Sequence, residues 1–242
     1  MGDFPSVPSD LPPRDIAVRI EGARVVLRGD RSLFWPELGW LVIADLHLGK
    51  AESLRRDGIA LPDAVMATDL ARLQLAVAAT GATRLLVLGD LVHDAAGLTD
   101  QLVQRVTAWR DSIDGEIALI PGNHDRRVER LPAAWRITPL AETLREGPFL
   151  FSHEPQPAGA PRSPQDDWRF NWHGHLHPVR TVRGGVDRVR VPVFALDHRC
   201  GILPAFSTLT GGSECARERY ARHWAVIDGH VIELAPPAPD AD

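Results

Sequence analysis

Five short clusters of aspartate, asparagine and histidine are spaced along the chain, and four of them follow runs of apolar residues. They comprise Asp45 with His47, then Asp90, then Asn123 with His124 and Asp125, then His153, and finally His175 with His177. The apolar runs before the first four clusters are typical of short, fully buried strands in parallel sheets. Because the carboxyl ends of such strands lie at one edge of an α/β sheet, where ligands bind, we expect these side chains to meet.

The residue types in these clusters are those that hold divalent metal ions. Hydrolysis of a phosphodiester at neutral pH needs a hydroxide and stabilised oxygens, and two cations about 3.5–4 Å apart supply both by lowering the pKa of a shared water. One carboxylate, here that of Asp90, can bridge two such ions. Neutral imidazole and amide ligands do not cancel the positive charge of the ions. Mixed nitrogen and oxygen ligands favour manganese, iron or zinc over calcium.

Simpler interpretations exist for single members of these clusters. A lone aspartate after a strand is more often a cap or turn residue, and a lone histidine is more often part of the core. Five clusters are poorly explained in that way. For His93, a role beside the metals competes with a structural hydrogen bond. The Arg126, Arg127 and Arg130 cluster fits phosphate contacts about as well as a solvated surface.

The elements that would position these residues follow from periodicity and turn residues. Residues 16–20 and 24–28 read as a hairpin, residues 39–44, 84–88 and 116–120 as strands, and residues 62–81 and 98–109 as amphipathic helices. Strands that alternate with helices predict parallel βαβ units. The second half contains mainly short β runs at 149–151, 169–172, 179–182, 188–195, 223–227 and 231–234. Residues 154–167 contain four prolines, and we expect this loop to lie beside the metals and to move when substrate enters.

Length and composition suit a soluble globular protein. The chain has 242 residues, of which 44% are hydrophobic and 24% charged, which predicts one domain at 15–235 with disordered tails at 1–14 and 236–242. A net charge of −5 argues against a protein that coats nucleic acid. The two cysteines favour free thiols in a reducing compartment. Without an apolar run of membrane-spanning length or a signal peptide, we expect a cytoplasmic protein and no membrane partner.

In their order, the five clusters resemble the motif set of the calcineurin-like metallophosphoesterase superfamily, from Leu41 to Pro178. This resemblance implies an α/β fold, a four-layer α-β-β-α sandwich of two mixed sheets flanked by helices, with a dinuclear metal centre. By position, one metal would be held by Asp45, His47, His177 and the bridging Asp90, and the other by Asp90, Asn123, His153 and His175. His124 would approach the leaving-group oxygen or the phosphate, oriented by Asp125 or Asp45.

A narrower resemblance covers nearly the entire chain. Residues 44–51, 89–93, 153–155, 174–178, 203–206 and 210–212 resemble the bacterial ligase-associated DNA damage response endonucleases. These proteins are grouped with an ATP-dependent DNA ligase, a helicase and an exonuclease-like nuclease. The resemblance therefore implies a DNA phosphodiesterase or endonuclease that acts in repair. For its two metal ions we expect manganese, with iron and zinc as alternatives. His93 stands where many superfamily members carry Asp or Asn. Two alternatives stay open: a hydrolase of a small phosphodiester or nucleotide, and a non-catalytic binding module.

Overall fold

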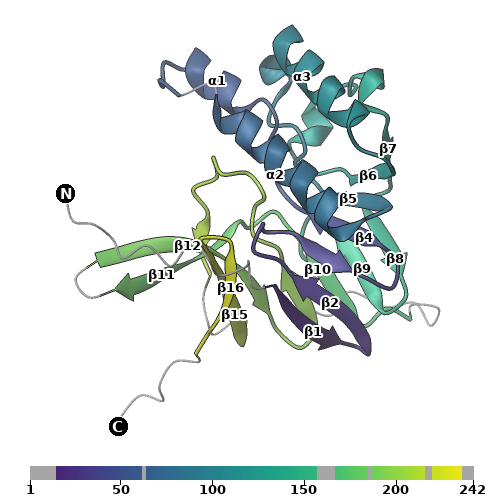
Figure 1. Cartoon of the computed structure of the whole chain (residues 1–242), viewed down its shortest axis with the longest axis vertical. Coiled ribbons are helices and arrows are strands. Elements are labelled where there is room, and N and C mark those ends of the chain that lie inside the picture. Colours follow the sequence, from purple (N-terminus) through teal and green to yellow (C-terminus); the bar gives the residue numbers. More distant parts are fainter. Residues whose placement is uncertain (1–14, 62–63, 157–166, 185–186, 216–219, 236–242) are drawn as a thin grey trace.

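Two β-sheets pack against each other, and helices cover the outer face of one of them (Figure 1). The computed structural model describes residues 15–61, 64–156, 167–184, 187–215 and 220–235. The expected tails and residues 157–166 of the expected loop lie outside these described residues. None of the described helices is long and apolar enough to span a membrane.

The first sheet has seven strands, hydrogen-bonded in the order of the sequence. They are β1 (Ile16–Ile20), β2 (Ala23–Leu27), β3 (Leu33–Trp35), β4 (Trp40–Ile43), β5 (Arg84–Leu88), β6 (Glu116–Ile120) and β7 (Ile137–Pro139). Strands β1 to β4 pair antiparallel, whereas β4 to β7 pair parallel. Since β4 and nearly all of β5 and β6 are buried, their continuous apolar sequences suit a sheet that is covered on both faces.

Helices α2 (Ala64–Thr80) and α3 (Asp100–Asp111) lie on the outer face of the first sheet. Their buried Leu70, Leu73, Leu102 and Val106 pack in one cluster with apolar side chains of β4, β5 and β6. Thr99 caps α3, because its side chain accepts a hydrogen bond from the backbone N–H of Leu102. The short helix α1 (Lys50–Arg56) follows the first cluster of polar residues.

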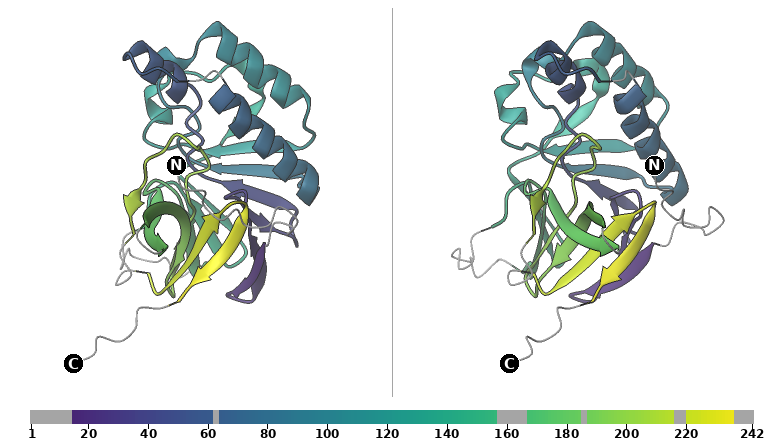
Figure 2. Two further views of the ribbon diagram at one scale, coloured as in Figure 1. Left: turned by 60° about the vertical axis from the view of Figure 1, so that its left-hand side comes forward. Right: turned by 90° about the vertical axis from the view of Figure 1, so that its left-hand side faces the viewer.

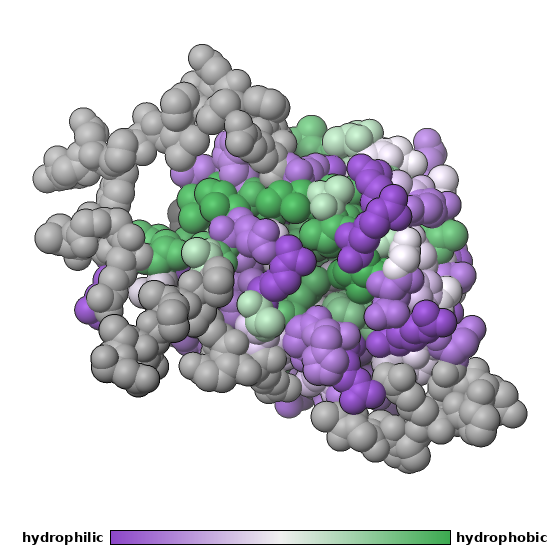
Figure 3. All heavy atoms as spheres, turned by 90° about the horizontal axis from the view of Figure 1, so that it is seen from below, coloured by the Kyte–Doolittle hydropathy of each residue, from purple (hydrophilic) through white to green (hydrophobic). Residues whose placement is uncertain are grey.

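The second sheet has nine strands, with β9, β10 and β13 parallel at its centre. Its strands are β8 (Thr143–Glu146), β9 (Phe149–Ser152), β10 (Phe170–His173), β11 (Pro178–Gly184), β12 (Asp187–Leu196), β13 (Cys200–Ile202), β14 (Ser213–Glu214), β15 (Arg222–Ile227) and β16 (His230–Leu234). The space between the sheets is filled by aliphatic and aromatic side chains, the latter including Trp35 and Phe149, whose ring centroids are 4.8 Å apart. Figure 2 shows the sheets beneath the helices, and Figure 3 shows the opposite end, where hydrophobic and hydrophilic surface intermingle.

The expected sandwich of two mixed sheets is confirmed, and β5 and β6 have the bounds that periodicity predicts. Helices α2 and α3 pack on the first sheet, and α1 lies against the turn Ala95–Gly97. On the outer face of the second sheet, the described residues form a small apolar cluster with Cys215 and Tyr220 where a further helical layer was expected. The physical reason is connectivity: the hairpins β11–β12 and β15–β16 need no crossover helix, and the hairpin β11–β12 also makes the connection between the parallel strands β10 and β13.

Candidate metal centre

The five polar clusters converge at the edge where strands of both sheets end. Asp45 and Asp90 each lie two residues beyond the ends of β4 and β5, and His153 directly follows β9. Asn123 follows β6, and His175 follows β10. All seven residues expected to bind metal are brought together here, in two groups of donor atoms.

The first donor group consists of Asp45, His47 and His177. Nε2 of His177 lies 3.2 Å from Oδ1 of Asp45 and 3.3 Å from Nε2 of His47. Asp45 is fully buried and His47 is 4% exposed. Three donor atoms so close together have the spacing of ligands around one small cation.

The second donor group consists of Asp90, Asn123, His153 and His175. Nε2 of His153 lies at its centre, 3.1 Å from Oδ1 of Asn123 and 3.1 Å from Nδ1 of His175. It also lies 3.5 Å from Oδ1 of Asp90. The amide oxygen of Asn123 therefore joins three residues whose types alone already suggest a metal site.

Asp90 faces both donor groups with different oxygens. Its Oδ1 is the atom near His153, whereas its Oδ2 lies 3.9 Å from Nε2 of His47 in the first group. A carboxylate that presents one oxygen to each group is placed as the predicted bridge requires. The backbone N–H of His124 donates to Oδ1 over 2.9 Å and fixes the rotation of the carboxylate.

The chemistry of the second donor group fits a cation. Nδ1 of His153 donates to the carbonyl oxygen of Leu88 over 2.9 Å, so the neutral ring carries a lone pair on Nε2. That lone pair faces oxygens of Asn123 and Asp90, which only accept. Lone pairs that face one another repel unless a cation lies between them. The residues present therefore suit a divalent metal.

The electrostatic surroundings keep His47 in the form that binds metal. Burial, followed by the charges that His177, Lys50, His124 and His93 carry, lowers the pKa of His47 to about 2. Its imidazole is therefore neutral and has a lone pair available to a cation. Burial also lowers the pKa of Lys50, although the carboxylates of Asp45 and Asp90 act in the opposite direction.

Backbone strain is concentrated in the same residues. Nine described residues other than glycine have a positive φ, and five of them are candidate ligands. These five are Asp45 (56°), His47 (50°), Asp90 (50°), His175 (70°) and His177 (43°). Each such residue costs about 1–3 kcal/mol and persists only where the surroundings impose it. Strain at five ligands indicates that the fold holds them for a function.

Gly122 allows the turns after β5 and β6 to approach closely, and we predict that Gly122→Ala weakens metal binding. A Cβ at this position would lie 2.5 Å from the backbone nitrogen of Asp90 and would overlap its carboxylate. The bridging oxygens must then move, so we expect a loss of at least 10-fold in metal affinity, measured by isothermal titration. Gly211→Ala is the matched control, since a Cβ there meets no atom within 4 Å. Equal affinities in the two variants would contradict the prediction.

The expected role of Asp125 is corrected by its hydrogen bonds. Its carboxylate accepts from the backbone N–H groups of Val92 (2.9 Å), Gly122 (2.9 Å) and Leu91 (3.3 Å). Asp125 therefore does not orient His124 but ties the turn after β5 to the turn after β6. Burial raises the pKa of Asp125, while these N–H groups act to lower it.

We predict that Asp125→Ala destabilises the protein and displaces both turns. The change leaves three buried N–H groups without an acceptor, and each such group costs about 1–3 kcal/mol. The free energy of unfolding should fall by about 3 kcal/mol or more, as measured by urea denaturation. Asp111→Ala, at an exposed ion pair with Arg136, should change it by less than about 1 kcal/mol. A small loss in Asp125→Ala would show that water replaces the carboxylate.

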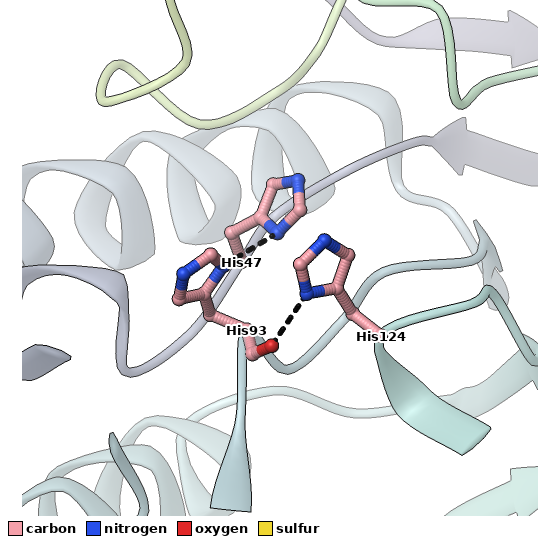
Figure 4. A group of neighbouring side chains, drawn as sticks. All are labelled: His47, His93 and His124. Carbon is pink, nitrogen blue, oxygen red and sulfur yellow. Dashed lines mark hydrogen bonds between the residues drawn. The ribbon is translucent and has the colours of Figure 1, made fainter. Parts of the chain in front are cut away.

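His124 is oriented by the backbone of His93, and not by Asp125 or Asp45 as expected. Its Nδ1 donates to the carbonyl oxygen of His93 over 2.6 Å, and the two rings stack with centroids 4.8 Å apart (Figure 4). The ring of His93 also reaches the first donor group, since its Nδ1 lies 3.4 Å from Nδ1 of His47. His93 therefore contacts a candidate ligand through its ring and His124 through its backbone.

Of the three arginines that follow the third polar cluster, Arg126 pairs with acidic residues. Arg126 lies 3.3 Å from Glu142 and 4.0 Å from Glu154, which supports the solvated-surface interpretation for that residue. Arg127 and Arg130 are exposed.

The sequence did not predict the backbone groups that hold the site. Examples are the carbonyl of His93 and the N–H of Ser207, which donates to the carbonyl of Asp45 over 3.2 Å. No sequence signal identifies them, because every residue type supplies the same groups.

Comparisons with known proteins agree with this geometry. The crystal structure of nuclease MPE from Pseudomonas putida is similar to this chain, with 30% sequence identity and a TM-score of 0.77. The similarity covers 91% of this chain and 100% of that nuclease. No family model matches the sequence, and no curated protein matches it either.

Two further solved structures are more distant. The phosphoesterase Yfce from E. coli has 16% identity and a TM-score of 0.39, over 82% of this chain and 99% of its own. Vps29 from Entamoeba histolytica, complexed with zinc, has 17% identity and a TM-score of 0.34, over 81% of this chain and 96% of its own. We base no conclusion on these two, since their TM-scores lie below 0.5. The full-length similarity to nuclease MPE and the two donor groups show that the chain belongs to the calcineurin-like metallophosphoesterase superfamily and is a metal-dependent phosphoesterase.

Proposed function

We propose that this phosphoesterase is a DNA nuclease that cuts phosphodiester bonds within a strand. The observation that carries this proposal is the position of His124 beside the bridging carboxylate. Its Nε2 lies 4.0 Å from Oδ2 of Asp90, and its side chain is 25% exposed against 3% for Asp90. His124 therefore stands between the donor groups and solvent, where a substrate phosphate would enter.

Two divalent ions, with manganese as our first choice over iron or zinc, would be held by the two donor groups and bridged by Asp90. When bound, they would supply an activated water and neutralise the charge on the phosphate. Only Asp45 and Asp90 among the seven donors are carboxylates. The two carboxylates cancel half of the charge of two divalent ions, and the other half would be left to attract an anionic substrate.

His124 would complete the reaction by donating a proton. Because its Nδ1–H is already donated to the carbonyl of His93, only Nε2 is available to the substrate. In the protonated ring, Nε2–H can pass its proton to the departing deoxyribose oxygen as the phosphorus–oxygen bond breaks. Such a proton matters most for an alkoxide leaving group, which is the kind that a DNA strand provides.

Similarity to nucleases supports DNA as the substrate. The structure with 30% identity over 91% of this chain is named a nuclease, and the sequence resembles ligase-associated endonucleases. We therefore propose a role in DNA repair, in functional association with an ATP-dependent DNA ligase, a helicase and an exonuclease-like protein. The resemblance is the support for these partners.

The test compares substrates on one preparation of Mn²⁺-loaded protein. Single-stranded, nicked and duplex DNA would be assayed beside bis-p-nitrophenyl phosphate and a 2′,3′-cyclic nucleotide, with the Asp90→Asn protein as the control for contaminating nucleases. We expect cleavage of DNA and of bis-p-nitrophenyl phosphate. Hydrolysis of the small phosphodiesters without cleavage of any DNA would favour a small-molecule substrate. No hydrolysis of any substrate would favour a non-catalytic module.

A further inference from the structure

Residues 203–208, which we call the strap, cross the edge of both sheets directly behind the first donor group. The strap follows β13, and in Figure 1 this yellow-green segment rises from the second sheet towards α2. Three of its backbone N–H groups donate to this edge: Leu203 to His173 (2.9 Å), Phe206 to Ala44 (2.8 Å) and Ser207 to Asp45 (3.2 Å). The strap therefore contacts the backbone of a candidate metal ligand.

Three charged side chains hold the strap from its other side. Arg31 donates to the carbonyl oxygens of Ser207 (3.0 Å) and Ala205 (3.4 Å), Arg72 donates to that of Phe206, and Asp69 accepts from the N–H of Thr208 (3.0 Å). Arg31 lies in the turn between β2 and β3, and the other two lie on α2. Four consecutive residues of the strap are thus fixed through their backbones, whatever their side chains.

The three charges also interact with one another and with the strap. Asp69 is 4% exposed, and its Oδ1 lies 3.3 Å from Nη2 of Arg72. Arg72 also lies over the ring of Phe206, 4.3 Å from its centroid. Burial, together with the charge of Arg72, lowers the pKa of Arg31 to about 10. Apolar side chains could hold a loop without the desolvation cost of buried charges, so this arrangement indicates that the exact path of the strap backbone matters.

Asp45 depends on that path. Its φ of 56° is strained, and its two backbone groups are held from opposite sides. Its N–H donates to the carbonyl of Gly89 over 3.1 Å, and its carbonyl accepts from Ser207 on the strap. If the strap shifts, one of these two supports is lost and the Asp45 carboxylate can rotate away from His177.

We propose that Arg31, Asp69 and Arg72 are positioning residues that act through the strap on Asp45 and so set the metal affinity of the first donor group. The inference rests on the proposed metal-binding function. The second donor group is linked to Asp45 through the backbone N–H of His175, which donates to the Asp45 carboxylate over 3.0 Å. Because Asp45 offers its carboxylate directly to the first group, we expect the larger effect there. We therefore expect a selective loss of affinity for one of the two ions.

The test uses Arg72→Met and Asp69→Asn, both close in size to the native residues. Mn²⁺ binding would be followed by isothermal titration and by electron paramagnetic resonance, which detects the magnetic coupling of two neighbouring ions. We expect each variant to bind one ion about 10- to 100-fold more weakly, the range typical for loss of a partner that orients a ligand. The other ion should stay, and the coupled signal should fade at limiting Mn²⁺.

Arg84→Met is the matched control. Arg84 also pairs with an acid, Glu116 (2.6 Å), and lies 4.6 Å from the centroid of the Trp40 ring, but at the amino end of β5. It should bind Mn²⁺ like the wild type. Unfolding temperatures of all variants in EDTA report general destabilisation separately.

The outcomes test the role of the strap separately from the existence of a two-metal centre. Wild-type affinity for both ions in Arg72→Met and Asp69→Asn, even with lower unfolding temperatures, would overturn the inference and leave the strap a structural support. If the wild type binds a single ion, the two-metal centre is wrong. Weaker binding of that single ion in Arg72→Met than in Arg84→Met would still support the strap, and equal binding would refute it.

Discussion

The Asp90→Asn protein should bind neither metal tightly and should hydrolyse no phosphodiester at a measurable rate. Asp90 presents a different carboxylate oxygen to each donor group: Oδ1 lies 3.5 Å from Nε2 of His153, and Oδ2 lies 3.9 Å from Nε2 of His47. An amide supplies one neutral oxygen and a nitrogen that cannot bind a cation. Loss of a partner that orients a ligand costs about 10- to 100-fold in metal affinity, and loss of the bridging ligand should cost more.

The fold should survive this change. Asn has the shape of Asp, and its oxygen can still accept the N–H of His124, which donates to Oδ1 over 2.9 Å in the native protein. Metal content after gel filtration, measured by mass spectrometry, and turnover of bis-p-nitrophenyl phosphate test the prediction. Asp57→Asn is the matched control, because Asp57 is 66% exposed and pairs only loosely with Arg56 (3.8 Å). An Asp90→Asn enzyme with two metals and a normal rate would exclude Asp90 as the bridge.

The His124→Ala protein should keep its metals but cleave DNA about 10²–10⁴-fold more slowly, which is the usual contribution of a positioned general acid. His124 lies beside the metal centre, with Nε2 4.0 Å from Oδ2 of Asp90 and its ring centroid 5.0 Å from that of His47. Its role in our proposal is to protonate a deoxyribose oxygen. The loss should therefore shrink with bis-p-nitrophenyl phosphate, whose p-nitrophenolate departs without a proton.

Comparing the rate losses on the two substrates shows whether His124 donates a proton or only binds phosphate. Rates on single-stranded DNA and on bis-p-nitrophenyl phosphate would be measured at one Mn²⁺ concentration, together with metal content. His198→Ala, at an exposed histidine, controls for the loss of an imidazole. Equal losses on both substrates would mean that His124 binds phosphate and transfers no proton. Loss of metal would make His124 a ligand.

The sequence by itself determined the elements that deliver the ligands. The apolar runs at 84–88 and 116–120 coincide with β5 and β6, because burial on both faces requires apolar side chains at every position. The residues that follow each run are the ones that meet at the sheet edge. Strand periodicity and polar residues at strand ends are local properties, so a single sequence contains them.

Short helices and strands were harder to predict from the sequence. Strands β3, β7, β13 and β14 have two or three residues each, too few to establish a period. The seven-residue helix α1 was also not predicted, since it spans only two turns. Their positions depend on the neighbours with which they pair and pack.

The tertiary structure alone decided how the ligands are held. Asp125 was expected to orient His124, but its carboxylate accepts three N–H groups from two turns, and the carbonyl of His93 takes that role instead. The hydrogen bond from Ser207 to Asp45 joins residues that are 162 positions apart in the sequence. Backbone groups are the same in every residue, so their partners follow from the packing of distant segments and leave no pattern in the sequence.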